Sequence, residues 1–388
     1  MAERALIFPA QEYRDRVARL QAGMDAQGLD ALLLTTPADV FYTTGFLTRF
    51  WESPARPWFV VVPKAGDPVA VIPSIGAALM GRTWVRDIRT WDAPDPRDDG
   101  ITLLADTLAQ AVPAQGQIGL PMGPETHLRM PLAGFETLRA RLAPRRFVDA
   151  TACVQRVREV KSEAEIALIR DICTIAARAF DRVPDFAGAG QPLDAVFRDF
   201  QIALLAEGAD WVSYVAGGAG QGGYGDVISP ADPQPLRRGD ILMLDTGAVK
   251  DGYFCDFDRN FAIGAAPDAA RRAHDALWQA TEDALAALRP GMRARDVHAL
   301  LCAGLEKNGA TPSGGRLGHG LGITLTEWPS FTPLDDTRLR AGIVLTLEPG
   351  CVTGEGRIMV HEENIVLRDG GAELLSPRAP AELPELAR

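Results

Sequence analysis

The sequence lacks the features of several large protein classes. It has no apolar run of the ~18 residues that a membrane span needs, and its start resembles no signal peptide, so we expect a cytoplasmic protein without a membrane partner. Its five cysteines are scattered and never spaced as CxxC, which disfavours a disulfide framework or a zinc knuckle. The 40 basic and 51 acidic residues give a net charge of −11. No basic stripe offsets this charge, so nucleic acid is not an expected partner.

The length and composition predict two globular domains. A chain of 388 residues exceeds one compact core of usual size, and 47% hydrophobic with 23% charged residues are ordinary globular values. Three short β-rich runs between residues 30 and 73 predict an α/β first domain. A capping box at Ser162 and Glu165 opens a second, α+β sector. We therefore divide the chain into residues 1–155 and 156–388.

The stretch LDTGAVKDGYFCDFDRN, residues 244–260, places acids inside a predicted β-hairpin. Asp245 closes an apolar run, and the Asp-Gly pair at 251–252 is typical of a two-residue turn. That turn pairs Asp245 with Asp258 across the strands and sets Asp256 on the same face, where neighbouring Cβ atoms are ~5–8 Å apart. Such a spacing suits carboxylates that share a cation. A solvated hairpin face with surface acids is the alternative.

Three later stretches supply further candidate ligands. GRLGHGLG sets His319 between glycines, TLEPG ends an apolar run with Glu348, and HEENIVL opens another with Glu363. Neighbouring Glu362 is the competing ligand if the register is off by one. An oxygen-rich set with one imidazole suits divalent Mn, Fe, Co or Zn, and four negative charges match two such ions. The candidate metal ligands are Asp245, Asp256, His319, Glu348 and Glu363.

At these motifs the sequence resembles the creatinase/aminopeptidase P/prolidase superfamily. The resemblance spans about residues 12–370 and includes YTTGF, VREVKSEAEI and then the ligand motifs in order. It implies an α+β protein with an N-terminal creatinase-like α/β domain and a pita-bread catalytic domain. It implies a dinuclear-metal-dependent hydrolase of an amide or peptide C–N bond, in which Glu348 is both a metal ligand and the catalytic proton acceptor. It also implies a homodimer in which the aromatic stretch 41–51 reaches the partner, although that stretch could equally be core.

The residues around the expected metals depart from the family pattern. Proline-directed peptidases carry histidines where this chain has Gly225, Gly315 and Thr326, an arginine in place of His361, and a threonine in place of Asp258. His361 could instead pack beside the last ligand. A glycine-flanked arginine at 316 suits a substrate carboxylate or a loop salt bridge. The candidate substrate-binding residues are Thr326, Arg316, His361 and Asp258.

Three functions stay open from the sequence. The first is a peptidase acting on short peptides, and the second is a hydrolase or lyase of a small metabolite, as in creatinase, ectoine hydrolase or dimethylsulfoniopropionate lyase. The missing histidines favour the second. The third is a silent binding homologue, which the metal-ligand set disfavours. A dinucleotide fingerprint at 218–223 is set aside because the prolines that follow prevent the helix it requires.

Overall fold

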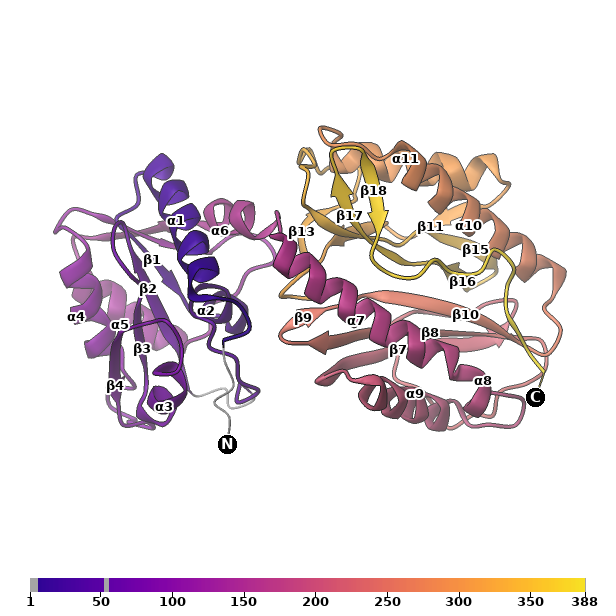
Figure 1. The fold of residues 1–388 in the computed structure, drawn as a ribbon, viewed down its shortest axis with the longest axis horizontal. Coiled ribbons are helices and arrows are strands. Elements are labelled where there is room, and N and C mark those ends of the chain that lie inside the picture. The colour runs from indigo at the N-terminus through magenta and orange to yellow at the C-terminus, as the bar shows by residue number, and fades with distance from the viewer. Residues whose placement is uncertain (1–5, 52–55, 388) are drawn as a thin grey trace. The chain divides into compact units, whose positions relative to one another are not determined.

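The computed structural model describes residues 6–51 and 56–387, which form two compact units, residues 1–158 and 159–388 (Figure 1). The predicted boundary at 155 falls inside helix α6, Thr151–Arg158, which belongs to the first unit. None of the helices in the described part of the chain is long and apolar enough to cross a membrane.

The first unit is built on one six-stranded sheet in the order β4-β3-β2-β1-β5-β6. Strand β1 pairs antiparallel with β2 and parallel with β5, so the sheet is mixed. Its strands are β1 Ala31–Leu34, β2 Phe59–Pro63, β3 Val69–Pro73, β4 Asp87–Trp91, β5 Gln117–Leu120 and β6 Arg146–Asp149. Besides α6, its helices are α1 Ala10–Gln27, α2 Pro37–Thr44, α3 Ala77–Met80, α4 Ile101–Ala111 and α5 Leu132–Leu142. The predicted α/β character and the three predicted strands are confirmed.

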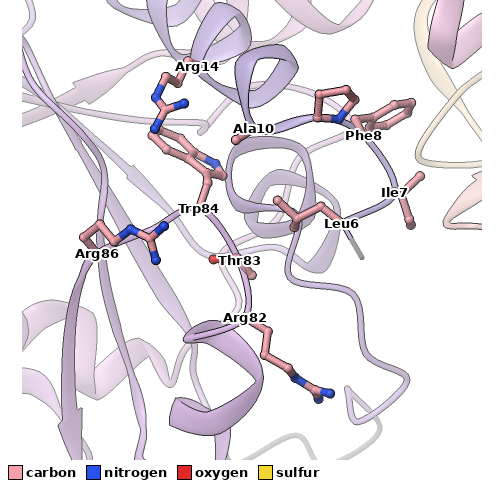
Figure 2. A pocket seen from close by; sticks show the side chains of 10 residues that line it. Leu6, Ile7, Phe8, Ala10, Arg14, Arg82, Thr83, Trp84 and Arg86 are labelled. Carbon is pink, nitrogen blue, oxygen red and sulfur yellow. The ribbon is translucent and has the colours of Figure 1, made fainter. Parts of the chain in front are cut away.

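The aromatic stretch 41–51 is mainly core in this unit. Phe41, Tyr42 and Phe46 are buried, whereas Phe50 is 50% exposed. A separate pocket of about 520 Å³ opens where the start of α1 meets segment 82–86 (Figure 2). There the Arg14 guanidinium lies 5.3 Å from the centre of the Trp84 ring.

The second unit contains two larger sheets and one small one. Their strand orders are β19-β10-β8-β7 with β9 on β8, β13-β12-β14-β17-β18, and β11-β15-β16. The strands are β7 Trp211–Gln221, β8 Asp240–Lys250, β9 Tyr253–Phe254, β10 Phe257–Ile263, β11 Thr311–Ser313, β12 Gly318–Gly320, β13 Glu327–Ser330, β14 Val344–Leu347, β15 Gly350–Gly354, β16 Arg357–Val360, β17 Glu363–Arg368, β18 Gly371–Leu374 and β19 Glu385–Leu386. The helices are α7 Glu163–Asp181, α8 Val183–Phe186, α9 Leu193–Glu207, α10 Asp268–Ala287 and α11 Ala294–Lys307.

Helices bury the apolar faces of these sheets. Val297 and Leu301 of α11 pack in one core cluster with Leu345 of β14 and Ile365 of β17. Removing such side chains from water contributes ~25 cal/mol per Å² of apolar surface. A hydrophobic core therefore holds α11 against the sheet that contains β14 and β17, and the predicted mixed α+β second sector is confirmed.

The predicted hairpin forms with the expected turn and register. Asp251 and Gly252 have φ of 49° and 84°, as a type I′ turn requires at both central positions. Asp245 pairs with Asp258 across β8 and β10, as predicted. Asp256 lies in the short gap between β9 and β10. The interruption frees Asp256 from the ladder and lets its backbone bond elsewhere.

Candidate metal centre

Five polar side chains come from strands of the second unit or from residues next to them. Asp245 lies within β8 and Asp256 between β9 and β10, whereas His319 is the central residue of β12. Glu348 directly follows β14, and Glu362 directly precedes β17. Strands β12, β14 and β17 are adjacent in one sheet, where His319 pairs with Thr346 of β14 and Leu347 pairs with Glu363 of β17. This pairing brings His319, Glu348 and Glu362 close together.

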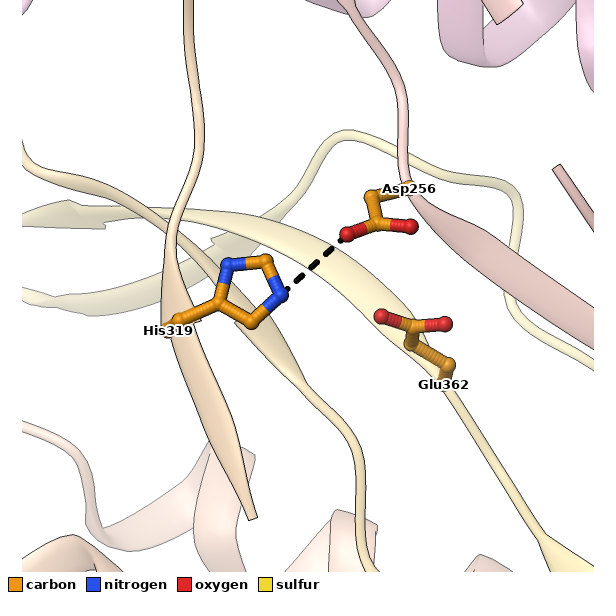
Figure 3. Close-up of side chains that lie close together, drawn as sticks. All are labelled: Asp256, His319 and Glu362. Atoms are coloured by element: carbon orange, nitrogen blue, oxygen red, sulfur yellow. Dashed lines mark ion pairs between the residues drawn. The ribbon is translucent and has the colours of Figure 1, made fainter. Parts of the chain in front are cut away.

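Three of these residues form a tight group that could hold a metal ion. Asp256, His319 and Glu362 each offer a ligand atom within 4.8 Å of the other two, and all three are buried. Figure 3 shows the three side chains converging, with His319 Nε2 lying 3.2 Å from Asp256 Oδ2. We call these residues the three-ligand group. Two carboxylates and one imidazole suit a divalent first-row metal ion.

The His319 imidazole and the backbone of Asp256 are each held by hydrogen bonds. His319 Nδ1 lies 2.8 Å from the carbonyl oxygen of Gly320, an arrangement in which Nδ1–H donates and Nε2 faces Asp256. The backbone N–H of Asp256 donates to Asn364 Oδ1 at 2.9 Å, and Asn364 Nδ2 donates back to the Asp256 carbonyl. These two bonds hold the backbone of Asp256, a predicted metal ligand, against strand β17, which contains Asn364.

Glu348 and Asp245 lie at the margin of the group. Glu348 Oε2 is 3.8 Å from His319 Nε2, and its side chain is 20% exposed. The other Glu348 oxygen accepts a hydrogen bond from Arg316 Nε at 3.3 Å. Asp245 keeps some exposed surface, and both of its carboxylate oxygens lie 3.2 Å from the hydroxyl of Tyr214.

We call the three-ligand group together with Asp245 and Glu348 the acidic cluster. In this cluster the carboxyl groups of Asp245, Glu348 and Glu362 have raised pKa values. Desolvation, followed by the charge of Asp256, raises the pKa of Asp245 and that of Glu362 well above their usual values. Burial also raises the pKa of Glu348, although the neighbouring imidazole opposes the rise. For His319, burial would lower the pKa, but Asp256 and Glu348 outweigh that effect and raise it. A divalent cation would relieve this repulsion, so the residues fit a metal ion.

The structure corrects the predicted ligand Glu363. This carboxylate is fully buried and accepts hydrogen bonds from Arg259 Nη2 at 3.1 Å and Arg378 Nη1 at 2.9 Å. The Ser376 hydroxyl and the Ala379 backbone N–H also donate to it. Successive side chains of an extended segment point to opposite sides. The competing residue Glu362 therefore faces Asp256 and His319, and Glu363 faces the arginines.

His361 and Asp258 also differ from their predicted roles in substrate binding. His361 is buried beside Arg378 and Glu363, away from the three-ligand group, and burial lowers its pKa to about 4. Asp258 is 1% exposed, and its Oδ1 accepts the backbone N–H of Glu362 at 2.8 Å. Asp258 therefore orients the segment that carries Glu362. Both residues lack the exposure that substrate contact requires.

The two remaining candidates lie at more accessible positions. The side chain of Arg316 is 37% exposed and pairs with Glu348, as the salt-bridge alternative anticipated. Thr326 is partly buried in the loop before β13. That loop is ordered by Glu327, which accepts the N–H groups of Ile323 and Thr324. Gly225 and Gly315 are exposed, with open space where a side chain would stand.

Tyr214 and Asn364 were not among the sequence candidates. Asn364 follows the two glutamates in the HEENIVL stretch, and an amide at the start of a buried strand is a detectable signal. Tyr214 carried no such signal, because it reaches the cluster only through an irregularity in strand pairing.

The residues from 167 to 369 match the model of metallopeptidase family M24. The chain belongs to this family. Residues 16–160 match the creatinase/prolidase N-terminal domain. A probable dipeptidase, PepE of Mycobacterium tuberculosis, is 30% identical over 95% of both chains. The predicted superfamily and the pita-bread fold of the catalytic unit are thereby confirmed.

Solved structures of M24 relatives share the fold along nearly the whole chain. Dipeptidase PepE from Mycobacterium ulcerans aligns with a TM-score of 0.84 at 28% identity, covering 98% of this chain and 99% of that one. A prolidase from Thermococcus sibiricus aligns with a TM-score of 0.85 at 22% identity, covering 96% and 99%, and shows the shared fold. Family M24 consists of metal-dependent peptidases, which supports the predicted hydrolase. The lyase alternative finds no support among these relatives.

Proposed function

We propose that this M24 chain is a metal-dependent hydrolase that cleaves the peptide C–N bond of a dipeptide or another small amide. The observation that carries the proposal is the buried three-ligand group within the family's catalytic fold. The relatives named as dipeptidases support a short-peptide substrate. The proposed site consists of Asp245, Asp256, His319, Glu348 and Glu362, with Glu362 in the place predicted for Glu363.

A bound divalent ion would supply Lewis acidity, which activates water and polarises a carbonyl. Glu348 is suited to accept and return the proton, because its side chain is 20% exposed and its pKa is raised. The Gly320 carbonyl holds the His319 ring in a fixed orientation. Arg316 lies beside Glu348 and is the proposed partner of a substrate carboxylate, since a guanidinium can bind a carboxylate through two N–H groups.

The proposed substrate is not the ordinary X-Pro dipeptide. Gly225, Gly315 and Thr326 stand where proline-directed members of the superfamily carry histidines, and none of them can transfer a proton as an imidazole does. These absences also favour the second candidate function, hydrolysis of a non-peptide amide of a small metabolite. Both candidates use the same metal centre and differ in the substrate that fills it.

A substrate panel with controlled metal content tests the proposal. The chain is stripped with a chelator, reloaded with Mn²⁺, Fe²⁺, Co²⁺ or Zn²⁺, and assayed with Gly-Pro, non-proline dipeptides and small amides. We expect metal-dependent hydrolysis of a non-proline substrate that Glu362→Gln abolishes. Glu355→Gln is the matched control and should leave the rate unchanged, because Glu355 is an exposed acid in the turn between β15 and β16. Hydrolysis that persists in Glu362→Gln would contradict the proposed site.

The homodimer and the cytoplasmic location expected from the sequence also stay proposals. Phe50, which lies in the aromatic stretch and is half exposed, is the residue of that stretch best placed to contact a second subunit.

A further inference from the structure

Tyr214 enters the acidic cluster from a β-bulge. The β7–β8 register shifts between Val212, which pairs with Ala248, and Val215, which pairs with Thr246. Ser213 and Tyr214 together therefore stand opposite the single residue 247. An extra residue in one strand twists the strand locally and redirects its side chains. Here the bulge directs the Tyr214 side chain toward Asp245.

Gly247 supplies the space that the tyrosine ring occupies. A Cβ atom at position 247 would lie 2.4 Å from Cε1 and 2.8 Å from Cδ1 of Tyr214. Both distances are far below a carbon–carbon contact of ~3.5–4.0 Å. The ring therefore lies against strand β8 only because residue 247 has no side chain, so the strand opposite the bulge is shaped to accept this ring.

The Tyr214 hydroxyl occupies the position that a cation would take between two aspartates. It lies 3.2 Å from each carboxylate oxygen of Asp245, and it donates a shorter hydrogen bond to Asp256 Oδ1. A cation bound by both oxygens of Asp245 would also be equidistant from them, at ~2.0–2.2 Å for a metal such as zinc. The phenol oxygen and that cation cannot both be present.

The other oxygen of Asp256 remains available on the opposite side. Oδ2 faces His319 Nε2 at 3.2 Å, and a ligand oxygen of Glu362 lies within 4.8 Å of the ligand atoms of both residues. The cluster is thus divided into a side closed by a phenol and a side with three converging ligands. Only the second side offers the ligand set of an ion site.

We infer that Tyr214 takes the place of one of the two cations predicted for this cluster, so that the chain binds one divalent ion, at Asp256, His319 and Glu362. The inference rests on the proposed metal centre and changes its stoichiometry. It also assigns Tyr214 a positioning role: its hydrogen bond holds Asp256 Oδ1, so that Oδ2 stays directed toward His319.

Metal stoichiometry tests this inference independently of activity. Metal-free protein is titrated with Mn²⁺ by calorimetry, and the loaded protein is studied by electron paramagnetic resonance, which distinguishes an isolated ion from an exchange-coupled pair. We expect one ion and an isolated-ion spectrum for the unmodified chain. Tyr214→Val should bind two ions and show the coupled spectrum, because the shorter side chain opens the Asp245 side. Tyr214→Ala serves the same purpose if Tyr214→Val does not fold.

Three results would overturn the inference. Two ions in the unmodified chain would show that Tyr214 moves aside when metal binds. One ion in a folded Tyr214→Val or Tyr214→Ala variant would show that something else limits the stoichiometry. An absence of bound ion in every variant, with no metal-dependent activity, would instead remove the proposed metal centre, so failure of the proposed function is distinguishable from failure of this inference alone.

Discussion

Glu362 and Glu363 are neighbours in the chain, but their carboxylates belong to different networks. Glu362 Oε1 accepts a 2.5 Å hydrogen bond from the Thr346 hydroxyl and lies in the three-ligand group. Glu363 is enclosed by Arg259 and Arg378, and the charge of Arg259 together with hydrogen bonds from His361 and Ser376 holds its pKa well below its usual value against the effect of burial. Burial and neighbouring acids instead raise the pKa of Glu362, so the fold disfavours charge on the first carboxylate and stabilises it on the second.

Substitution of each glutamate by glutamine should therefore have opposite effects. Glu363→Gln leaves the Arg259 guanidinium, which is 10% exposed, without its anion and removes one of the two anions that pair with Arg378, so we expect it to lower the free energy of unfolding by ~3–5 kcal/mol. Glu362→Gln puts a neutral amide in place of a carboxyl group whose ionisation the metal-free fold disfavours, so the metal-free protein should be as stable as before or more stable, while metal binding is lost. Urea unfolding and Mn²⁺ titration of both variants measure these effects. Metal binding retained by Glu362→Gln and lost by a stable Glu363→Gln would restore the original ligand prediction.

The stability of the metal-free protein should fall as pH rises from about 6.5 to about 8.5. In this range the unfolded chain has ionised Asp245 and Glu362, whereas burial and neighbouring acids raise their pKa values in the folded chain and so favour their protonated forms there. Asp258, whose pKa burial raises to about 8, acts in the same direction. The folded state then binds more protons, so stability decreases with pH. The pKa of His361 is lowered to about 4 in the folded chain, so below pH 6.5 the unfolded chain binds a proton there more readily than the folded chain does. This residue therefore reduces the stability of the protein mainly below the stated range.

Melting temperatures at the two pH values, with and without Mn²⁺, measure this effect. We expect the metal-free protein to melt lower at the higher pH and the metal to raise the melting temperature more there, because binding stabilises the ionised carboxylates. Glu362→Gln should show a weaker pH dependence. A metal-free melting temperature that rises over this range would rule out protonated acids in the cluster.

Restoring histidines should convert the chain toward proline-directed cleavage. Gly225 and Gly315 have no atoms within 4 Å of an added Cβ, so histidines fit there without backbone adjustment. We expect Gly225→His, Gly315→His and Thr326→His together to raise kcat/KM for Gly-Pro by ~10²-fold or more, since positioned acid–base groups contribute ~10²–10⁴-fold each. Gly370→His, at an equally open turn position, should have no effect. Efficient Gly-Pro cleavage by the unmodified chain would contradict the prediction.

The buried ion pair of Lys161 and Glu327 should stabilise the loop that contains Thr326. Lys161 Nζ lies 2.8 Å from Glu327 Oε2, and both side chains are at most 5% exposed. Lys161→Met removes this cation from beside a buried carboxylate and should cost ~3–5 kcal/mol in the free energy of unfolding. The exposed pair of Lys250 and Asp210 provides the control, since Lys250→Met should cost at most ~1 kcal/mol. Equal losses in the two variants would refute this account.

The proposed homodimer can be tested at Phe50. We expect light scattering to give the mass of a dimer at micromolar concentration, and Phe50→Glu to shift the equilibrium toward the monomer, because it puts a charge into an apolar contact. Leu132→Glu, at an exposed apolar position of the same unit, should leave the mass unchanged. A monomeric mass for the unmodified chain would dismiss the dimer.

Local chemistry explains what the sequence by itself determined. The Asp251-Gly252 turn and the alternation of the flanking residues predicted the pairing of Asp245 with Asp258, which the structure shows. The ligand residue types and their order along the chain indicated the superfamily, and the match to the family M24 model agrees with this prediction. These features depend on residues close in sequence, so no knowledge of distant contacts was needed to recognise them.

The tertiary structure decided which atoms face the metal centre. The choice between Glu362 and Glu363 follows from the pairing of β14 with β17, in which Leu347 lies opposite Glu363. The approach of Tyr214 follows from a bulge opposite Gly247. Both depend on the alignment of strands far apart in sequence, and a shift of one residue turns a side chain to the other face. Residue types alone therefore identified the candidate metal ligands. Only the packing of the sheets determined which of these side chains point toward the metal centre.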